Sequence, residues 1–198
     1  MGDSNQLYYL RRHVPSAHGP VLEIGSKDYG NTADFRAIYR DVPYVGLDLA
    51  SGRNVDVVHD LTKGIGPLAP DHFDLAICCS VLEHVDRPWD FARHVSRVVR
   101  PGGLLYMSVP WVWRFHAYPD DYFRFSWRGI EVLFPDFEWR ERYYSTNVDD
   151  EFISIDEFRD ADNRMSLLQE VEGGLRKHLP YLMLNMLGTR RHDTPAID

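Results

Sequence analysis

The sequence has few cysteines, no excess of basic residues and no long hydrophobic run. Its two cysteines, Cys78 and Cys79, are neighbours in an apolar stretch, so they could bond to each other only through a strained ring. This usage predicts a reducing, cytoplasmic setting. No apolar run approaches the roughly 20 residues that a membrane span needs, and the polar segment Met1 to His13 lacks the apolar core of a signal peptide. We therefore expect no membrane partner.

Acidic residues are in excess: 30 aspartates and glutamates stand against 22 lysines and arginines, which gives a net charge of -8. Such a chain has no general attraction to phosphate backbones, so nucleic acid is not expected as a partner. A length of 198 residues and a hydrophobic content of 44% suit one domain with one core. We therefore expect residues 1–198 to form a single domain, and its oligomeric state stays open.

Short runs rich in Val, Ile and Leu alternate with helix-like segments through the first two thirds of the chain. This alternation is typical of repeated strand-helix units around a parallel sheet, whose buried strands read as continuous apolar runs. The expected fold class is therefore α/β, with a Rossmann-like, mostly parallel sheet and helices on both faces. The expected strands are Val21 to Ile24, Tyr44 to Leu47, Val55 to His59, Phe73 to Cys78, Gly103 to Val109 and Phe137 to Tyr144.

Helices are expected where capping residues precede apolar positions at helical spacing. Capping signals mark three of them, and a fourth lies in the last fifty residues, where Pro180 would interrupt its continuation. After Pro180 the run Tyr181 to Leu187 suits either a helical end or a final strand. The defining residues are Asn31 and Thr32 before Phe35, Ile38 and Tyr39; Asp86 and Pro88 before Trp89 to Val99; Ser126 before a short helix to Phe134; and Asn163 to Lys177.

Glycine and acidic residues follow the first three expected strands. Gly25 opens the first loop, where the missing side chain lets a ligand approach the backbone. Asp48 ends the second strand about twenty residues later, in the position of a carboxylate that accepts ribose hydroxyls. Asp60 ends the third strand at the same edge of the sheet. The set predicts a nucleotide-type cofactor site, and an ordinary cap or turn role is the alternative for both aspartates.

The stretch Phe73 to Val85, FDLAICCSVLEHV, is followed by a helix and by Arg100-Pro101-Gly102-Gly103. With the loops above, it resembles the class I S-adenosylmethionine-dependent methyltransferases of the small methyltransferase-domain group, over roughly residues 20 to 135. The resemblance implies S-adenosylmethionine as cofactor and a small-molecule methyl acceptor. By position it implies cofactor contacts from Glu23, Gly25, Ser26, Lys27, Gly30, Asp48, Leu49, Asp60, Leu61, Ser80 and Val81.

One departure from the family pattern lies in the first loop. Family members often have glycines two and four places after the first, and this chain has Lys27 and Tyr29 there, with Gly30 one step later. The loop is therefore expected to take a different path, with Lys27 directed to the cofactor carboxylate. The resemblance also favours an antiparallel last strand at Tyr181 to Leu187, preceded by an insertion at about residues 145–180.

The segment Trp111 to Arg124 follows the fifth strand and is dense in aromatic and ionisable residues. It leaves the sheet at the ligand-binding edge, so it is expected to form the acceptor pocket. A histidine there could take the proton of a hydroxyl acceptor. His116 and His84 are the candidate bases, and Trp111, Asp120, Asp121, Tyr122 and Arg124 are expected to contact the acceptor. A salt-linked aromatic cover over the core is the alternative.

Two other functions and a metal site were weighed against this interpretation. A nicotinamide-dependent oxidoreductase would need G-x-G-x-x-G, which Gly25 to Gly30 does not match. A binding module with this fold and no turnover is consistent with the altered glycine loop. A metal site from His84, Asp86 and His116 lacks metal-type spacing, so no required metal is expected.

Overall fold

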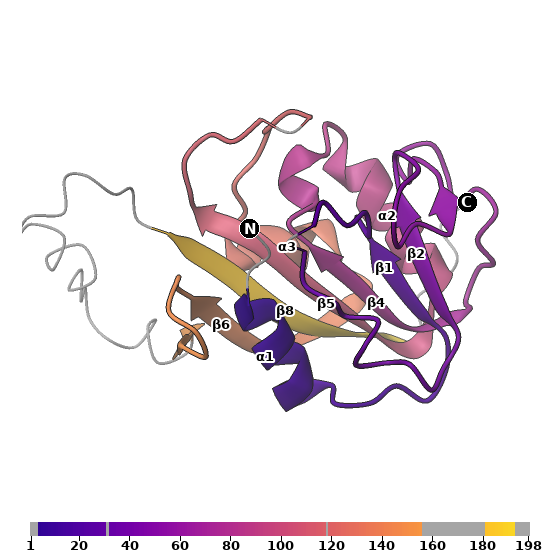
Figure 1. Cartoon of the computed structure of the whole chain (residues 1–198), viewed down its shortest axis with the longest axis horizontal. Coiled ribbons are helices and arrows are strands. Elements are labelled where there is room, and N and C mark those ends of the chain that lie inside the picture. The colour runs from indigo at the N-terminus through magenta and orange to yellow at the C-terminus, as the bar shows by residue number, and fades with distance from the viewer. Residues whose placement is uncertain (1–3, 31, 118, 156–180, 193–198) are drawn as a thin grey trace, which may run out of the picture.

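One mixed sheet of eight strands runs through the molecule (Figure 1). The computed structural model describes residues 4–30, 32–117, 119–155 and 181–192. The strand order across the sheet is β3-β2-β1-β4-β5-β8-β6-β7. The strands are β1 (Val21–Ile24), β2 (Tyr44–Asp48), β3 (Val57–Val58), β4 (Phe73–Cys79), β5 (Val99–Val112), β6 (Phe137–Ser145), β7 (Phe152–Ser154) and β8 (Leu182–Arg190).

The first five strands form the parallel half of the sheet, as the sequence predicts. β1 lies between β2 and β4, and every pair in this half is parallel. All four residues of β1 are buried, and three of them, Val21, Leu22 and Ile24, are apolar. Two strands in this half differ from the prediction by more than one residue, and one of them, β5, begins at Val99 instead of Gly103. β3 keeps only Val57–Val58, and β5 runs on to Val112, so Trp111 stands on a strand and not in the following loop.

The last three strands form the antiparallel half. β8 pairs antiparallel with both β5 and β6, which confirms the predicted final strand and rules out a helical end. The strand runs through Gly188, where the sequence suggests a stop. A side chain at this position would be crowded, because a Cβ on Gly188 would lie 3.1 Å from side-chain atoms of Phe137 and Trp139 on β6. The glycine makes room for two aromatic rings across the strand pair.

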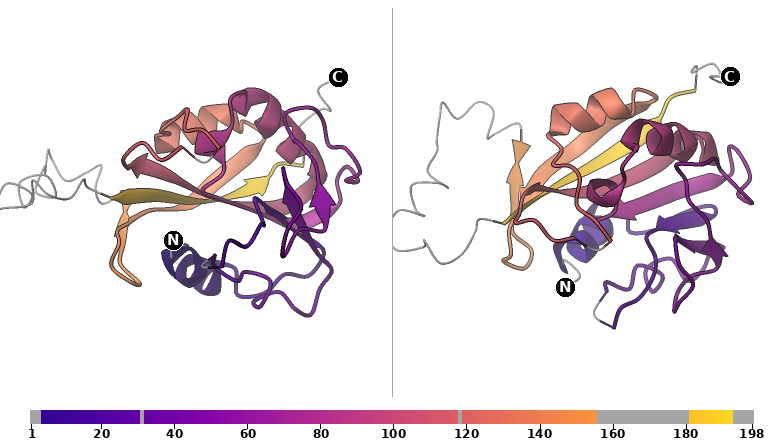
Figure 2. Two further views of the ribbon diagram at one scale, coloured as in Figure 1. Left: turned by 45° about the horizontal axis from the view of Figure 1, so that its top comes forward. Right: turned by 90° about the horizontal axis from the view of Figure 1, so that it is seen from above.

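Helices cover both faces of the sheet, as predicted (Figure 2). α1 (Ser4–His13) lies on one face, and α2 (Pro88–Val98) and α3 (Trp127–Leu133) lie on the other. Pro88 opens α2 as expected, but the N-cap is Arg87 and not Asp86. Trp89 is 60% exposed, although its helical spacing suggested a core position, because α2 packs on the sheet through the opposite side of its first turn. The hydroxyl of Ser126 accepts a hydrogen bond from the Gly129 amide and caps α3 as predicted.

The N-terminal helix α1 is a feature that the polar sequence of this segment did not reveal. Tyr9 and Leu10 are fully buried, and the Tyr9 ring stacks on Tyr106 of β5 with 4.6 Å between ring centroids. The Tyr9 hydroxyl donates a hydrogen bond to the carbonyl of Glu141, where β6 is irregular in register. α1 therefore fixes one face of the sheet and the irregular part of β6.

The helix expected after the first loop is wrong. Residues 36–41 form turns, in which the amides of Ile38 and Tyr39 bond to carbonyls three residues earlier. Phe35 and Tyr39 are buried in the same cluster as Tyr9 and Leu10 of α1, so their apolar spacing reflects core contacts. The Tyr39 hydroxyl also donates to the carbonyl of Val14, which ties the turns to the end of α1. The predicted cap Asn31 lies outside the described residues.

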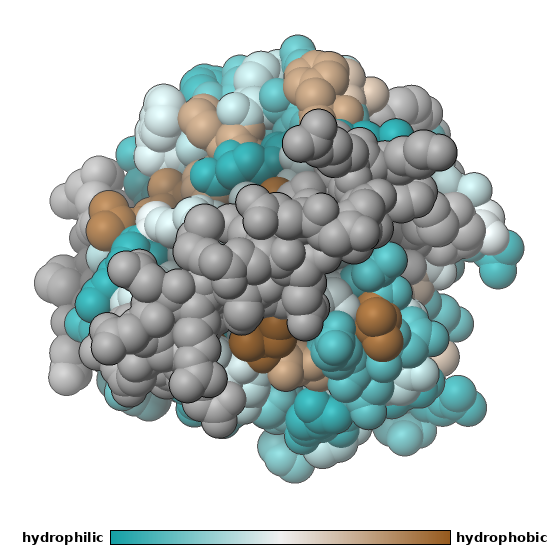
Figure 3. Space-filling model, turned by 90° about the vertical axis from the view of Figure 1, so that its left-hand side faces the viewer, coloured by the Kyte–Doolittle hydropathy of each residue, from teal (hydrophilic) through white to brown (hydrophobic). Residues whose placement is uncertain are grey.

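The segment after β6 is described only up to residue 155. β7 pairs with the end of β6 there, and the expected helix Asn163 to Lys177 lies outside the described residues. The coloured surface on the face shown in Figure 3 is mainly hydrophilic, with separate hydrophobic side chains. Among the described helices, none has the length and apolar character needed to cross a membrane.

We expect Tyr9→Ala to lower the free energy of unfolding by about 3–5 kcal/mol, the usual loss for removing a buried aromatic ring. Tyr9→Phe should cost about 1 kcal/mol, because it removes only the hydrogen bond to Glu141. The neighbouring half-buried Tyr8 gives the control, and Tyr8→Ala should cost clearly less than Tyr9→Ala. Urea denaturation measures all three. Equal losses for Tyr8→Ala and Tyr9→Ala would contradict the docking of α1.

Candidate functional site

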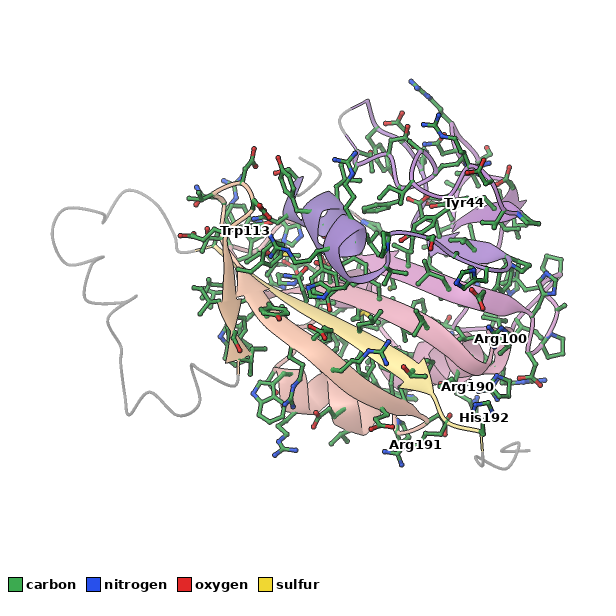
Figure 4. The ribbon with its side chains drawn as sticks, turned by 90° about the horizontal axis from the view of Figure 1, so that it is seen from below. Tyr44, Arg100, Trp113, Arg190, Arg191 and His192 are labelled. Atoms are coloured by element: carbon green, nitrogen blue, oxygen red, sulfur yellow. The ribbon has the colours of Figure 1, made fainter. Side chains whose placement is uncertain are left out.

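The carboxyl ends of the parallel strands lie side by side at one edge of the sheet. Ile24 at the end of β1 is level with Leu47 of β2 and Cys78 of β4, and Asp48 is level with Val58 of β3. The loops that carry the predicted cofactor residues therefore start from one edge. Figure 4 shows Trp113 beyond the carboxyl end of β5, with Arg100 and Arg190 at the opposite end of the strands.

Gly25 joins the first loop to the loop after β4. It has a φ of +77°, a conformation that disfavours other residues, and a Cβ there would lie 2.3 Å from Cγ2 of Val81. Its amide donates to the carbonyl of Leu47 over 2.8 Å. Glycine is thus required at this position by both conformation and contact, and the two predicted cofactor residues Gly25 and Val81 are in direct contact.

Asp48 joins the first loop to the loop after β2. Its carboxylate accepts hydrogen bonds from the amides of Lys27 (3.1 Å) and Ala50 (3.2 Å). A carboxylate has about four acceptor sites, so these two bonds leave capacity for further donors. The next residue, Leu49, is 61% exposed. Asp48 therefore lies where the sequence placed it, with acceptor sites still available.

The rest of the first loop follows a path of its own. Ser26 is buried, and its hydroxyl has no hydrogen-bond partner in the described part of the chain. The Lys27 ammonium lies 5.3 Å from the ring centroid of Tyr29. Gly30 has a φ of +98°, and its amide bonds to the Asp28 carboxylate over 2.6 Å. The glycine conformation thus occurs at Gly30, one step later than in the family pattern.

Asp60 holds its own turn. Its carboxylate accepts from the amide (2.9 Å) and hydroxyl (2.7 Å) of Thr62 and lies 3.1 Å from the Lys63 ammonium. Leu61 is buried, and its carbonyl is bonded to Nδ1 of His94. The turn role that the sequence left open as an alternative therefore accounts for the contacts of Asp60.

Glu23 is a buried acid at this edge. The Tyr44 hydroxyl of β2, labelled in Figure 4, donates to Oε2 of Glu23 over 2.7 Å. Burial raises the pKa of Glu23 to about 7, and the hydrogen bond from Tyr44 only partly opposes this rise. Glu23 thus changes charge near neutral pH.

Ser80 begins the loop after β4 with a φ of +53°, and its amide donates to the carbonyl of Ser108 on β5. The side-chain amide of Gln6 on α1 donates to the hydroxyls of both Ser80 and Ser108, over 3.3 Å each. Gln6 is buried at the site edge, and no sequence pattern indicates this role, because the polar segment around it does not predict a helix. α1 therefore adds a residue to the site.

The segment after β5 is braced by a buried ion pair. Asp121 and Arg124 form two hydrogen bonds between carboxylate and guanidinium, one of them 2.7 Å long. These bonds hold the pKa of Asp121 far below its usual range. Arg124 also donates to the carbonyls of Trp113 (3.3 Å) and Arg114 (3.0 Å). Arg124 and Asp121 thus shape this segment from within.

The braced segment lies against the loop after β4. The amides of Tyr122 and Phe123 donate to the backbone carbonyl of Glu83, over 2.8 and 3.3 Å. Glu83 and His84 belong to a short 3-10 helix, η1 (Leu82–His84). The Tyr122 side chain is 49% exposed. The two segments that supply the predicted bases are therefore joined through the backbone.

Glu83 brings the two predicted bases together. Its Oε1 lies 3.8 Å from Nε2 of His84 and 3.9 Å from Nε2 of His116. The Glu83 side chain is only 1% exposed, and burial raises its pKa to about 8. Glu83 stood in the diagnostic stretch beside His84, but nothing in the sequence indicated that it is buried between two histidines. Trp111 lies apart from this cluster, beside Tyr144 of β6.

The comparisons with known proteins find methyltransferases. A family model described as a methyltransferase domain matches residues 30–107. A methyltransferase of Mycobacterium avium is 45% identical over 114 residues, which cover 51% of this chain and 43% of that protein. The ubiquinone biosynthesis O-methyltransferase of Chromobacterium violaceum is 31% identical over 118 residues, with 52% of this chain and 50% of that protein covered.

The fold comparison covers nearly the whole chain. A phosphoethanolamine N-methyltransferase of Haemonchus contortus, solved with phosphomonomethylethanolamine and S-adenosylhomocysteine, aligns with a TM-score of 0.58 at 14% identity. The alignment spans 94% of this chain and 52% of that one. This chain has the fold of class I methyltransferases, and its residues 30–107 match a methyltransferase-domain model. The chain spans about a fifth to a half of the length of the curated relatives it matches.

The raised pKa of Glu23 predicts that the free energy of unfolding depends on pH. The pKa of Glu23 in the folded protein, about 7, lies above the ordinary glutamate value of 4.5. The stability that the protonated form contributes is therefore complete below about pH 4.5 and is lost as the pH rises through about 7. Glu23→Gln cannot ionise, so between about pH 4 and pH 8 its stability should rise relative to the wild type by roughly 3 kcal/mol.

The measurement is urea denaturation of both proteins across this pH range. The exposed Glu138→Gln is the matched control, because it makes the same chemical change at the surface. A difference between wild type and Glu23→Gln that stays constant with pH would show that Glu23 is not held protonated by burial.

Proposed function

We propose that the chain is an S-adenosylmethionine-dependent methyltransferase that acts on a hydroxyl group of a small-molecule acceptor. The observation that carries this proposal is the link between Asp48 and the Gly25 loop at the carboxyl edge of the sheet, through the Lys27 amide. This edge is where open α/β sheets bind nucleotide ligands. The single-domain organisation and the cytoplasmic location predicted from the sequence stay predictions.

The residues at this edge suit the parts of S-adenosylmethionine. The available acceptor sites of Asp48 suit the ribose hydroxyls, and the buried Glu23 carboxyl suits the cationic amino group at the methionine end. The buried Ser26 hydroxyl has no hydrogen-bond partner among the described residues, so it is available to a ligand. The proposed cofactor residues are Glu23, Gly25, Ser26, Lys27, Gly30, Asp48, Leu49, Asp60, Leu61, Ser80 and Val81.

The chain's own contribution to the reaction is alignment. When bound, the cofactor supplies a sulfonium methyl group that is already a strong electrophile. No nucleophilic side chain is then needed, and the protein has to hold the acceptor oxygen in line with the methyl group and exclude water. Gly25 and Val81 bring the cofactor loop against the loop that carries Glu83 and His84, so the two halves of the site are adjacent.

The acceptor is proposed to lie between η1 and the segment Trp113 to Arg124. His116 and His84 are the proposed activating residues, because their Nε2 atoms face a common point beside Glu83. Asp120, Asp121, Tyr122 and Arg124 are the proposed acceptor-shaping residues, with Trp111 at the outer end of β5. An oxygen acceptor is favoured because the Chromobacterium violaceum relative is an O-methyltransferase.

Asp48→Ala should weaken binding of S-adenosylmethionine and S-adenosylhomocysteine by about 1.5–3 kcal/mol, the scale for losing hydrogen bonds to a charged group. Asp41→Ala removes the same charge from an exposed turn before the amino end of β2, so it should leave the affinity unchanged. Isothermal titration calorimetry measures both variants, with thermal melting to check the fold. Unchanged affinity in Asp48→Ala would sink the cofactor assignment, and binding without any turnover would identify a binding module.

His116→Ala should lower turnover by about a hundredfold or more, with cofactor affinity nearly intact. The assay follows S-adenosylhomocysteine release over a panel of hydroxyl acceptors, with His84→Ala measured beside it. If only His84→Ala loses turnover, the activating residue lies in the loop after β4. If both variants keep turnover, alignment alone suffices and the histidines are structural.

A further inference from the structure

Three side chains from two separate segments converge beside the proposed acceptor position. Glu83 and His84 come from η1, and His116 comes from the segment after β5. One carboxylate oxygen and one ring nitrogen from each histidine all lie within 4.8 Å of one another. The rings of His84 and His116 meet edge to face, with 5.0 Å between centroids. We call these three residues the Glu-His-His cluster.

Among the described residues, no other residue donates a hydrogen bond to the Glu83 side chain. Both of its carboxylate oxygens are buried, and neither has a partner in the described part of the chain. A buried polar group without a partner is costly, and a buried carboxylate is usually paired or bound to a metal. The distances of 3.8 and 3.9 Å from Oε1 to the two Nε2 atoms are too long for hydrogen bonds. Something between these atoms is therefore needed to satisfy Glu83.

The histidines present lone pairs to Glu83, because their other nitrogens are engaged. Nδ1 of His84 is bonded to the backbone carbonyl of Asp120. Nδ1 of His116 lies 3.1 Å from Oδ2 of Asp121 and 3.1 Å from the carbonyl of Arg114. These partners are acceptors, so the assignment that satisfies them puts the proton on Nδ1 of each ring. Each Nε2 is then an acceptor that faces a carboxyl oxygen of Glu83.

A cation satisfies this arrangement better than a single shared proton. A proton would draw one nitrogen to about 2.8 Å from Oε1 and leave the other without a donor. The two nitrogens are instead nearly equidistant from Oε1, at 3.8 and 3.9 Å. Ligand atoms at about 2.1 Å from a tetrahedral metal lie about 3.4 Å apart, so the two distances from Oε1 would each have to contract by roughly half an ångström.

We propose that Glu83, His84 and His116 bind a divalent transition-metal ion of the zinc or cobalt type. Two imidazoles and one carboxylate are a ligand set that Zn²⁺ and Co²⁺ accept, whereas Mg²⁺ prefers oxygen ligands. The partners on Nδ1, a backbone carbonyl for His84 and the Asp121 carboxylate for His116, are those that orient metal-binding histidines in other proteins. The sequence predicted no required metal because its candidate ligands His84, Asp86 and His116 lack compact metal-type spacing, and Glu83 was not among them.

The open side of the cluster faces solvent. Side-chain exposure rises from 1% at Glu83 to 15% at His84 and 31% at His116. Three protein ligands leave one position for an exogenous group, as in catalytic zinc sites. Asp86, which the sequence grouped with these histidines, does not contribute, because its carboxylate is 59% exposed and lies 3.9 Å from Arg87.

The role of the ion rests on the proposed function. An acceptor hydroxyl at the open position would lose its proton to water, because the metal lowers its pKa. The oxygen lone pair then forms the bond to the methyl carbon, and the electron pair of the carbon-sulfur bond passes to sulfur. The sulfonium becomes a neutral thioether and the acceptor becomes its methyl ether. In this scheme the two histidines act as metal ligands, and the metal lowers the pKa of the acceptor hydroxyl so that no general base is needed.

The test is metal titration of the full chain after treatment with a chelator and dialysis. We expect calorimetry with ZnCl₂ and CoCl₂ to give one site per chain, and Co²⁺ to show visible absorption bands of an imidazole-ligated ion. MgCl₂ at the same concentrations should give no binding. His116→Ala and Glu83→Gln should each weaken Zn²⁺ binding by about 100-fold or more, and Asp121→Asn by about 10- to 100-fold. The exposed His72→Ala should change nothing.

The outcomes separate this inference from the proposed function. S-adenosylhomocysteine binding is measured on the same samples, and thermal melting shows whether each variant folds. If Glu83→Gln does not fold, His116→Ala on its exposed segment still decides the ligand set. Absence of a Zn²⁺ site in the wild type, or equal Zn²⁺ affinity in wild type and His116→Ala, overturns the metal site even if the cofactor binds. A Zn²⁺ site with no cofactor binding supports the metal site and refutes the proposed function.

Discussion

Parallel hydrogen bonding between β1, β2, β4 and β5 places every loop of the candidate site at one edge. Because parallel strands share a direction, their carboxyl ends coincide, although the loops that follow are far apart along the chain. The contacts between Gly25 and Val81 and between Asp48 and Lys27 are consequences of this register. A shift of one residue in the pairing of β1 with β2 or of β1 with β4 would separate these groups. It would also turn the side chains of the shifted strand to the other face of the sheet.

A second constraint is the buried pair of Asp121 and Arg124. The pair folds the segment after β5 back on itself, and the amides of Tyr122 and Phe123 then reach the carbonyl of Glu83. This packing carries His116 to the side of η1. The acceptor side of the site is therefore shaped by an ion pair that need not touch the acceptor, and its geometry depends on the backbone bonds that the pair makes possible.

The N-terminal helix α1 supports the site from the other face of the sheet. Its aromatic contact with Tyr106 anchors the helix on β5, and Gln6 then reaches the hydroxyls of Ser80 and Ser108. Turns replace the helix that was expected after the first loop, and Phe35 and Tyr39 in this region pack in one buried cluster with Tyr9 and Leu10 of α1. Stability of this face and the position of the loop after β4 are thus coupled through one short helix.

Most strand positions could be predicted because buried parallel strands and their turn signals are local in sequence. Gly25 and Asp48 could be proposed as site residues for the same reason, since each lies at the end of a recognisable strand, whereas Ser80 was proposed from the family resemblance. Local pattern failed where the decisive contact is distant. The Tyr9 ring of α1 packs on Tyr106 of β5. Residues 36–41 form turns, and Tyr39 in them packs in the same buried cluster as α1.

The sequence by itself determined the α/β fold class and the similarity to methyltransferases. Only the tertiary structure decided what surrounds Glu83. The carboxylate is adjacent to His84 along the chain, but its burial and its second neighbour, His116, come from the packing of two segments joined by backbone hydrogen bonds. Burial and convergence depend on contacts between distant residues, and no local pattern of residue types encodes them.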